Sequence, residues 1–308
     1  MRAIKNGTLR LAAADALIRH CREHGVSLVY YLDDDLPHIP RDHPDAKILR
    51  PRARIVSRMV RGADALFVST PALAAAVADL RKDARVIANG IDERLWTALP
   101  RPTPPRQGPV RILFMGTMTH DADFDIVEPA LARIKTAFGE HVAIDVLGVS
   151  ARGDMPPWVN RIGLPVNAAS SYAGLVNWIT QHHWDIGIAP LADTPFNRCK
   201  SALKTLDYAA IGMPVLASDV DVYRGSLADG PGGWLVPNDP GAWFVALTTL
   251  VRNNALRRRL ADGARAAVAG WTLDAQASER RAAWLSLVRD KRRRSIVDAR
   301  REAVEARV

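Results

Sequence analysis

Two lysines and an aspartate are spaced so that they could bind a phosphate and a sugar attached to it. Lys200, Lys204 and Asp207 stand at positions i, i+4 and i+7, which places them on one face of a helix. Because a helix N-terminus favours anions, two ammonium groups in its first turns predict a phosphate at this end. Asp207, one turn further along, would accept hydrogen bonds from the sugar hydroxyls. The alternative is a surface helix whose lysines are simply solvated.

The helix that carries these residues is predicted to belong to an α/β sheet. It would begin near Cys199 and end at Gly212, and residues 212–218 would supply a helix stop and a buried strand. Apolar strands that alternate with helices indicate a parallel sheet covered on both faces. The other strands are expected at 110–116, 142–148 and 184–190, and the helices near 122–138, 168–182 and 200–211.

The carboxyl ends of these strands are the predicted ligand site, because ligands of open α/β sheets bind there, near the point where the strand order reverses. Three segments are expected at this edge: residues 116–120, residues 190–193 and the helix that starts near Lys200. They could form one crevice. Its candidate ligand-binding residues are Gly116, Thr117, His120, Asn197, Lys200, Ser201, Lys204 and Asp207.

The N-terminal part of the chain holds fewer predicted strands. They are expected at 27–32, 63–69 and 84–88, with helices near 9–24, 52–61 and 71–81. Asn89 and Gly90 are expected to form a turn, with a ligand contact as the alternative. Four prolines then crowd residues 100–105, which is the composition of a linker. The last part, from about 239 to 303, reads as consecutive helices.

The composition is that of an ordinary globular protein large enough for two domains. The 308 residues are 48% hydrophobic and 24% charged. Cys21 and Cys199 give neither a disulfide framework nor a metal-ligand cluster, which suits a reducing cytoplasm. No apolar run approaches the roughly 20 residues of a membrane-spanning helix, and the N-terminus lacks the apolar core of a signal peptide. We therefore expect a cytoplasmic protein.

The net charge of +9 is concentrated in part at the C-terminus. Such a basic tail could bind nucleic acid or an anionic membrane surface, or it could be a solvated terminal helix. The aromatic and basic interleaving of single-strand binders is absent from the sequence, so we expect no nucleic-acid partner. The basic residues of the tail are Arg289, Lys291, Arg292, Arg293, Arg294, Arg300 and Arg301.

Six segments of the chain match the motifs of a known family: residues 68–73, 86–92, 112–117, 184–191, 200–215 and 233–240. Together they resemble the GT-B fold nucleotide-sugar glycosyltransferases of family 4 and its relatives (glycosyl transferases group 1). The resemblance covers roughly residues 28 to 285, and its elements arrive in the family's order.

The resemblance implies two Rossmann-like domains that face each other across a cleft. They would be a partial N-terminal, acceptor-side domain (1–98), a linker (99–108), a nucleotide-sugar-binding domain (109–272) and C-terminal helices with the basic tail (273–308). The last helices would cross back to brace the N-terminal domain.

The resemblance implies roles for the candidate residues. Lys200 and Lys204 would hold the diphosphate of the donor. Asp207 stands where the family has the second glutamate of a Glu-x(7)-Glu pair, which binds the ribose, whereas Cys199 occupies the position of the first glutamate. That departure leaves open what contacts the transferred sugar. The family's Arg and Lys pair after the first glycine loop is also absent, so His120 or Thr119 would substitute, or the two lysines would act alone.

The implied activity is transfer of a sugar from a nucleotide diphosphate donor to a glycan or lipid-linked acceptor. Fixed cations would stabilise the leaving diphosphate, so neither a metal nor another cofactor is expected. Retention of anomeric configuration is implied by the resemblance alone. The basic tail would suit a peripheral position at the inner face of the membrane. Two alternatives are a sugar-nucleotide epimerase of the same fold and a non-catalytic remnant that binds a nucleotide sugar.

Asp33, Asp34 and Asp35 have three possible roles. They could lie on the acceptor side of the cleft, as the resemblance implies, they could cap a turn or helix, or they could bind a metal as an Asp-x-Asp motif. Only about 30 residues precede them, where relatives have several strands. The N-terminal domain is therefore expected to be incomplete, through a mis-assigned start, a fragmentary sequence or a reduced acceptor half. Such a sheet would expose an unpaired edge.

Overall fold

The computed structural model describes residues 10–97, 108–150 and 152–287 of the chain. It divides into two compact units, unit 1 (residues 1–88 with 276–308) and unit 2 (residues 89–275). Residues 89–97, which follow the last strand of unit 1, lie in unit 2. Most of the predicted linker and the whole predicted basic tail fall outside the described residues.

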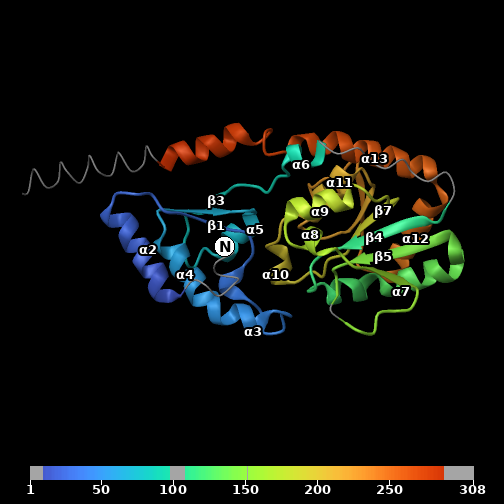
Figure 1. Ribbon diagram of the computed structural model, residues 1–308, viewed down its shortest axis with the longest axis horizontal. Helices are drawn as coiled ribbons and strands as arrows, with labels where there is room; N and C mark the ends of the chain where they lie inside the picture. Colours follow the sequence, from blue (N-terminus) through green and yellow to red (C-terminus); the bar gives the residue numbers. More distant parts are fainter. Residues whose placement is uncertain (1–9, 98–107, 151, 288–308) are drawn as a thin grey trace, which may run out of the picture. The chain divides into compact units, whose positions relative to one another are not determined.

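Unit 1 is built on a parallel sheet of three short strands, β1 (Val29–Leu32), β2 (Ala65–Val68) and β3 (Arg85–Val86), in the order β1-β2-β3 (Figure 1). All three strands were predicted, since each is a short apolar run after a helical pattern. The helices are α2 (Leu11–Glu23), α3 (Ala46–Leu49), α4 (Ala53–Gly62) and α5 (Pro71–Ala76), with 3-10 turns η1 (Leu36–His38) and η2 (Arg50–Arg52).

Helix α5 ends earlier than the predicted residue 81. Its N-terminus is well defined, because Thr70 accepts the backbone N–H of Leu73 and a proline follows at the first helical position. The chain turns at Val77, and the guanidinium of Arg81 donates to the carbonyls of Ala63 and Asp64. These bonds to the segment that enters β2 favour a turn over a continued helix.

The helix at residues 277–287 belongs to unit 1, as predicted for the final helices. The rings of Phe67 and Trp284 meet edge to face at 5.3 Å, and Leu287 is buried with Ala65 and Phe67. Arg280 donates to the carbonyl of Ala88 at 2.5 Å. The core of unit 1 is therefore completed by a segment that follows unit 2 in the sequence.

Unit 2 contains a six-stranded parallel sheet in the order β6-β5-β4-β7-β8-β9 (Figure 1). Strand β6 was not predicted: of its four residues only Val159 is buried, while Asn160 and Arg161 are exposed, so it lacks a continuous apolar run. The strand order reverses between β4 and β7, which makes this the expected ligand edge. The strands are β4 (Val110–Met115), β5 (Val142–Leu147), β6 (Val159–Ile162), β7 (Ile186–Ala189), β8 (Val215–Ser218) and β9 (Gly233–Val236).

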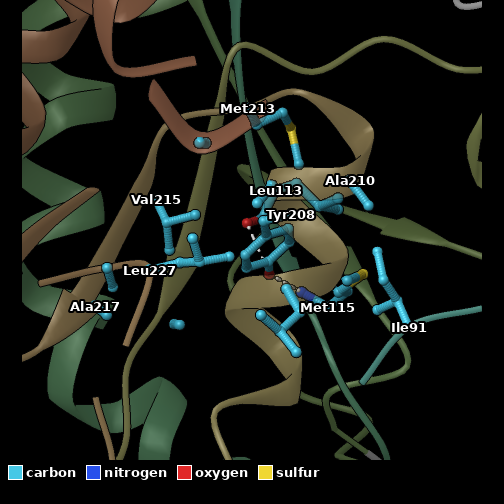
Figure 2. Packing of buried hydrophobic residues seen from close by; sticks show 14 of the residues in the cluster. Ile91, Leu113, Met115, Tyr208, Ala210, Met213, Val215, Ala217 and Leu227 are labelled. Carbon is cyan, nitrogen blue, oxygen red and sulfur yellow. Dashed lines mark hydrogen bonds between the residues drawn. The ribbon is translucent and has the colours of Figure 1, made fainter. Parts of the chain in front are cut away.

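Helices cover both faces of this sheet, with an apolar core on each side. One core packs α9 (Tyr172–Ile179) and α11 (Leu203–Ile211) on the sheet, and its central members are shown in Figure 2. The other core packs α7 (Asp121–Phe138) and α12 (Pro240–Arg252). The remaining elements are α6 (Glu93–Thr97), α8 (Val166–Ala169), α10 (Pro195–Arg198), α13 (Asn254–Val268), η3 (Gly139–His141) and η4 (Ala269–Trp271).

One predicted helix is divided in two, and another begins later than predicted. The prediction of one helix at 168–182 is wrong because Ser171 caps a new helix by accepting the N–H of Gly174. The helix predicted from Cys199 ends at Gly212 as expected, but its predicted start is wrong. Helix α10 starts at Pro195 behind the cap Thr194 and ends at Arg198, and α11 begins only at Leu203. Residues 199–202 form a turn between them.

Candidate functional site

The site is built from the segments that follow β4 and β7, together with the N-terminus of α11. Asp123, near the start of α7, accepts the backbone N–H of Ala192 at 2.6 Å, which ties the segment after β7 to the helix after β4. The ammonium of Lys204 lies 4.8 Å from the centre of the Phe114 ring, and that ring lies 6.3 Å from the His120 ring. Residues from all three predicted segments therefore come together at the reversal of strand order.

Gly116 is required by the ring of His120. A Cβ on residue 116 would lie 2.6 Å from Cδ2 of the imidazole, closer than side chains approach, and 3.2 Å from Nε2. The turn is held by the N–H of Gly116, which donates to Leu147 at 3.0 Å, and by the N–H of His120, which donates to Val149 at 3.1 Å. The glycine loop therefore serves to seat the imidazole against the backbone.

His120 and Asp123 form a buried pair. Nδ1 of His120 lies 2.5 Å from Oδ2 of Asp123, and both residues are at most 9% exposed. Burial lowers the pKa of His120 to about 4, together with the positive charge of Lys204 and, more weakly, of Lys200, while the bond to Asp123 opposes the shift. Burial disfavours ionisation of Asp123, but its bonds from His120 and Ala192 outweigh that effect and lower its pKa. At neutral pH the imidazole is uncharged and Asp123 is a carboxylate.

Lys204 places a cation in this site without a hydrogen-bond partner. Its Nζ is buried and makes no hydrogen bond to any described residue. Burial lowers the pKa of Lys204 to about 8, with the charge of Lys200 acting in the same direction and Asp123 and Asp207 opposing it. A buried ammonium that keeps its charge at pH 7 without a bonded acceptor is suited to an anionic ligand.

Lys200 lies outside the helix, in the turn that precedes α11, so the predicted helical spacing does not explain its position. Its Nζ lies 5.6 Å from the centre of the Phe196 ring. It nevertheless affects the pKa values of both His120 and Lys204, so it is close to them. No described side chain caps the N-terminus of α11. The N–H of Thr205 bonds to the carbonyl of Ala202 at 2.9 Å, which leaves the N–H groups of Leu203 and Lys204 available to a ligand.

The other predicted ligand residues mainly shape the loops. Asn197 donates through Nδ2 to the carbonyl of Ala192 at 2.9 Å. The hydroxyl groups of Thr117 and Thr119 form a hydrogen bond of 3.0 Å with each other. Ser201 accepts a bond of 2.8 Å from Nδ2 of Asn89, so residue 89 reaches the turn that carries Lys200.

Asp207 is paired with a tyrosine from a different helix. The hydroxyl of Tyr172, at the start of α9, donates to Oδ1 of Asp207 at 2.6 Å. Burial raises the pKa of Asp207 to about 7, while the bond from Tyr172 and the charge of Lys204 oppose the shift. Tyr172 in turn packs edge to face on Trp96, with ring centres 6.4 Å apart.

The three consecutive carboxylates lie in unit 1, directly after β1. Asp35 is buried and its Oδ1 lies 2.8 Å from Nδ1 of His38. Asp34 accepts the N–H of Leu36 through its carbonyl at 2.7 Å, and the carbonyl of Asp33 accepts the hydroxyl of Ser69 at 3.2 Å. These bonds form a turn at the carboxyl end of the strand. Across the described residues, no group of three or more His, Cys, Asp or Glu side chains is arranged to hold a metal ion.

Two residues of the site were not identified from the sequence. Asp123 follows His120 by three positions at the start of a helix, a spacing that could have indicated the pair. Tyr172 gave no such signal, because its partner Asp207 lies far away in the sequence.

Comparison with known proteins identifies the fold. No family model matches the chain. Its structure superposes on HepE from Anabaena with a TM-score of 0.62 and 16% identity, over 90% of this chain and 76% of that one. Sucrose-phosphate synthase from Thermosynechococcus elongatus superposes with a TM-score of 0.62 and 15% identity, over 91% of this chain and 72% of that one. TarM superposes with a TM-score of 0.59 and 13% identity, over 85% of this chain and 50% of that one. The fold is that of the GT-B glycosyltransferases, as predicted.

Two curated proteins resemble parts of the sequence. The O-antigen biosynthesis protein RfbC of Myxococcus xanthus is 32% identical over 162 residues, which are 52% of this chain and 12% of that protein. The phosphatidyl-myo-inositol mannosyltransferase of Mycobacterium leprae is 51% identical over 59 residues, 18% of this chain and 16% of that enzyme. The chain therefore spans a minor part of the length of these relatives. None of the helices in the described part of the chain is long and apolar enough to cross a membrane.

Proposed function

We propose that this protein is a glycosyltransferase that takes a sugar from a nucleotide diphosphate donor bound to unit 2. The observation that carries the proposal is the buried ammonium of Lys204, which has no hydrogen-bond partner among the described residues and lies at the strand-order reversal. A phosphate bound there would satisfy Lys204, and the uncapped N-terminus of α11 would supply backbone N–H donors.

The diphosphate would bind between Lys204, Lys200 and the start of α11. During transfer the bond between the sugar and the diphosphate breaks, and negative charge grows on the oxygen that leaves. Two fixed ammonium groups in a partly desolvated site stabilise that charge without reorganisation. We propose that the reaction needs no metal on this account. Retention of configuration is proposed from the resemblance to family 4.

Asp207 is proposed to bind the ribose of the donor. Its carboxylate is oriented by Tyr172, and it follows Lys204 by three positions on α11, so both face one side of the helix. The HepE structures contain UDP, alone or with glucose, and UDP-glucose, so uridine is the first base to test.

The acceptor is proposed to be a growing glycan or a lipid-linked sugar. RfbC is named for O-antigen biosynthesis, and the mycobacterial enzyme is named for transfer to phosphatidyl-myo-inositol. Both names describe sugars built on a lipid or surface glycan. We propose contact of the basic tail with an anionic membrane, at the inner face, for the same reason.

Calorimetric titration with uridine, guanosine, thymidine and adenosine diphosphates tests the donor site. One of them should bind to the wild type, and the double variant Lys200→Ala/Lys204→Ala should lose a hundredfold or more of that affinity, because two charged hydrogen bonds disappear. Lys82→Ala is the control, since Lys82 is an exposed lysine of unit 1. If no nucleotide binds to the wild type, the proposed function is wrong.

A further inference from the structure

His120 has an unpaired ring nitrogen beside Gly116, in the loop that forms part of the site just described. Its Nδ1 is committed to Asp123, and its Nε2 has no hydrogen-bond partner among the described residues. Gly116, by lacking a Cβ, leaves room for the Nε2 edge of the ring. The imidazole therefore has one free position, and the state of that nitrogen decides which ligand group it can bind.

The bonds of Asp123 determine the tautomer of this imidazole. One carboxylate oxygen accepts the backbone N–H of Ala192, and the other faces Nδ1 of His120. A carboxylate can only accept, so Nδ1 must carry the proton. In a neutral imidazole the second nitrogen is then an acceptor with a free lone pair. Among the groups close to His120, Asp123 favours a charged ring, and Lys204 and Lys200 disfavour it.

A nitrogen that only accepts cannot bind a phosphate oxygen, which also only accepts. It requires an O–H or N–H donor on the ligand. We propose that Nε2 of His120 accepts a hydrogen bond from a hydroxyl group of the transferred sugar, and that Asp123 is the positioning residue that fixes the ring for this contact. The inference rests on the proposed function, because the sugar must be attached to a diphosphate held by Lys200 and Lys204.

The position of Cys199 supports a sugar contact from elsewhere in the site. Its side chain is buried and its Sγ donates to the carbonyl of Pro195 at 3.5 Å. This residue therefore points into its own helix turn and offers nothing to a sugar. His120 lies on the segment after β4, close to Lys204, and supplies a polar group there.

The protonation of the ring can be measured directly. In protein labelled with nitrogen-15 at its eight histidines, the His120 signals are assigned by their loss in His120→Phe. We expect Nδ1 protonated and Nε2 unprotonated at pH 7. Asp123→Asn should reverse this pattern: Ala192 keeps the amide oxygen, so the amide NH2 faces Nδ1 and the proton moves to Nε2. A proton on Nε2 of the wild type at pH 7 would overturn the inference.

The ligand contact is tested by titration with UDP and UDP-glucose, or the corresponding pair for the base selected by the nucleotide panel. His120→Phe should bind UDP within about twofold of the wild type and UDP-glucose about tenfold more weakly, the effect of one lost hydrogen bond. His120→Gln, which can place an acceptor near the same point, should recover part of that loss. Asp123→Asn should lose less affinity than His120→Phe, because a protonated Nε2 can still donate a hydrogen bond to the hydroxyl oxygen.

The outcomes separate this inference from the proposed function. Equal weakening of both ligands in His120→Phe would mean that the ring binds the phosphates, and unchanged binding of both would mean that it binds neither. Either result overturns the inference while the donor site stands. Absence of binding to the wild type would instead overturn the proposed function.

Discussion

The backbone N–H of Met115 donates a hydrogen bond of 2.9 Å to the hydroxyl of Tyr208 (Figure 2). That hydroxyl donates in turn to the carbonyl of Ile188 at 2.9 Å. Met115 ends β4 and Ile188 lies in β7. One side chain of α11 therefore joins the two neighbouring strands between which the strand order reverses. Gly187 makes room for the ring, since a Cβ there would lie 2.7 Å from Cγ of Tyr208.

Removal of this hydroxyl should destabilise unit 2. In Tyr208→Phe the buried N–H of Met115 loses its acceptor, and we expect a loss of about 1–3 kcal/mol in the free energy of unfolding. Urea denaturation measures it. Tyr30→Phe is the matched control, because the buried hydroxyl of Tyr30 has no hydrogen-bond partner among the described residues. Equal stability of the two variants would show that Tyr208 does not join the strands.

Lys204 should reduce the stability of the protein while supporting its function. Its pKa is lowered from 10.5 to about 8, so the folded state disfavours the charged form. The resulting loss in the free energy of unfolding is fully present below pH 8. Lys204→Met should therefore raise the free energy of unfolding at pH 7 by up to about 3 kcal/mol, the value of such a shift. The gain should fade as the pH rises from 8 to 10.5.

Thermal unfolding across this pH range measures the gain, and calorimetry should show that the same variant no longer binds the nucleotide. A variant that is less stable than the wild type at pH 7 would show that the ammonium is stabilised by the fold rather than held for a ligand.

Asp207 should make stability fall as the pH rises. The pKa of Asp207 in the folded protein is raised from 3.8 to about 7. Its stabilising contribution to the free energy of unfolding is therefore complete below pH 3.8 and is lost as the pH rises through 7. Because the side chain is only half-buried, solvent screens its charge, and Asp207→Asn should gain about 2 kcal/mol over the wild type at pH 8. The two proteins should converge below pH 4. Denaturant unfolding at pH 4, 6 and 8 provides the comparison.

Donor binding should show the opposite dependence on pH if Asp207 binds the ribose as a carboxylate. Affinity of the wild type should weaken as the pH falls below about 7, where Asp207 takes up a proton. Asp207→Asn should bind more weakly at pH 8 and show little change down to pH 6. Calorimetry at three pH values tests this, and a pH-independent wild type would contradict it.

Tyr172 should adjust that pH dependence. Its hydroxyl bond lowers the pKa of Asp207, so Tyr172→Phe should raise that pKa further. We expect the midpoint of the binding profile to move to higher pH and the affinity at pH 7 to fall several-fold. A shift of the affinity at all pH values by the same factor would instead indicate a direct contact between Tyr172 and the donor.

The sequence was most informative where structure is determined locally. Strands β4, β5, β7 and β8 were predicted because buried parallel strands are continuous apolar runs. Strand β6 was missed because it lies at the sheet edge and carries polar residues. The start of α11 was predicted about four residues too early, because a helical pattern of apolar residues does not exclude a turn before the helix.

The candidate site shows the same limit. Lys204, His120 and Asp207 were identified from spacing and resemblance, and the structure places Lys204 beside His120. The partner of Asp207 comes from another helix, and no sequence pattern links position 172 to position 207. The uncharged state of His120 depends on burial and on two lysines that lie about 80 positions later, which is a property of the folded chain.

The order of synthesis has a consequence for the core of unit 1. Leu287 is buried against Ala65 and Phe67, although unit 2 separates them in the chain. The ends of unit 2 are joined to each other, since Ile91 accepts the N–H of Leu273 and donates to the carbonyl of Trp271. During synthesis on a ribosome, unit 2 can therefore fold before the last helix of unit 1 has been made. We therefore expect the core of unit 1 to be completed only after residues 277–287 have been synthesised.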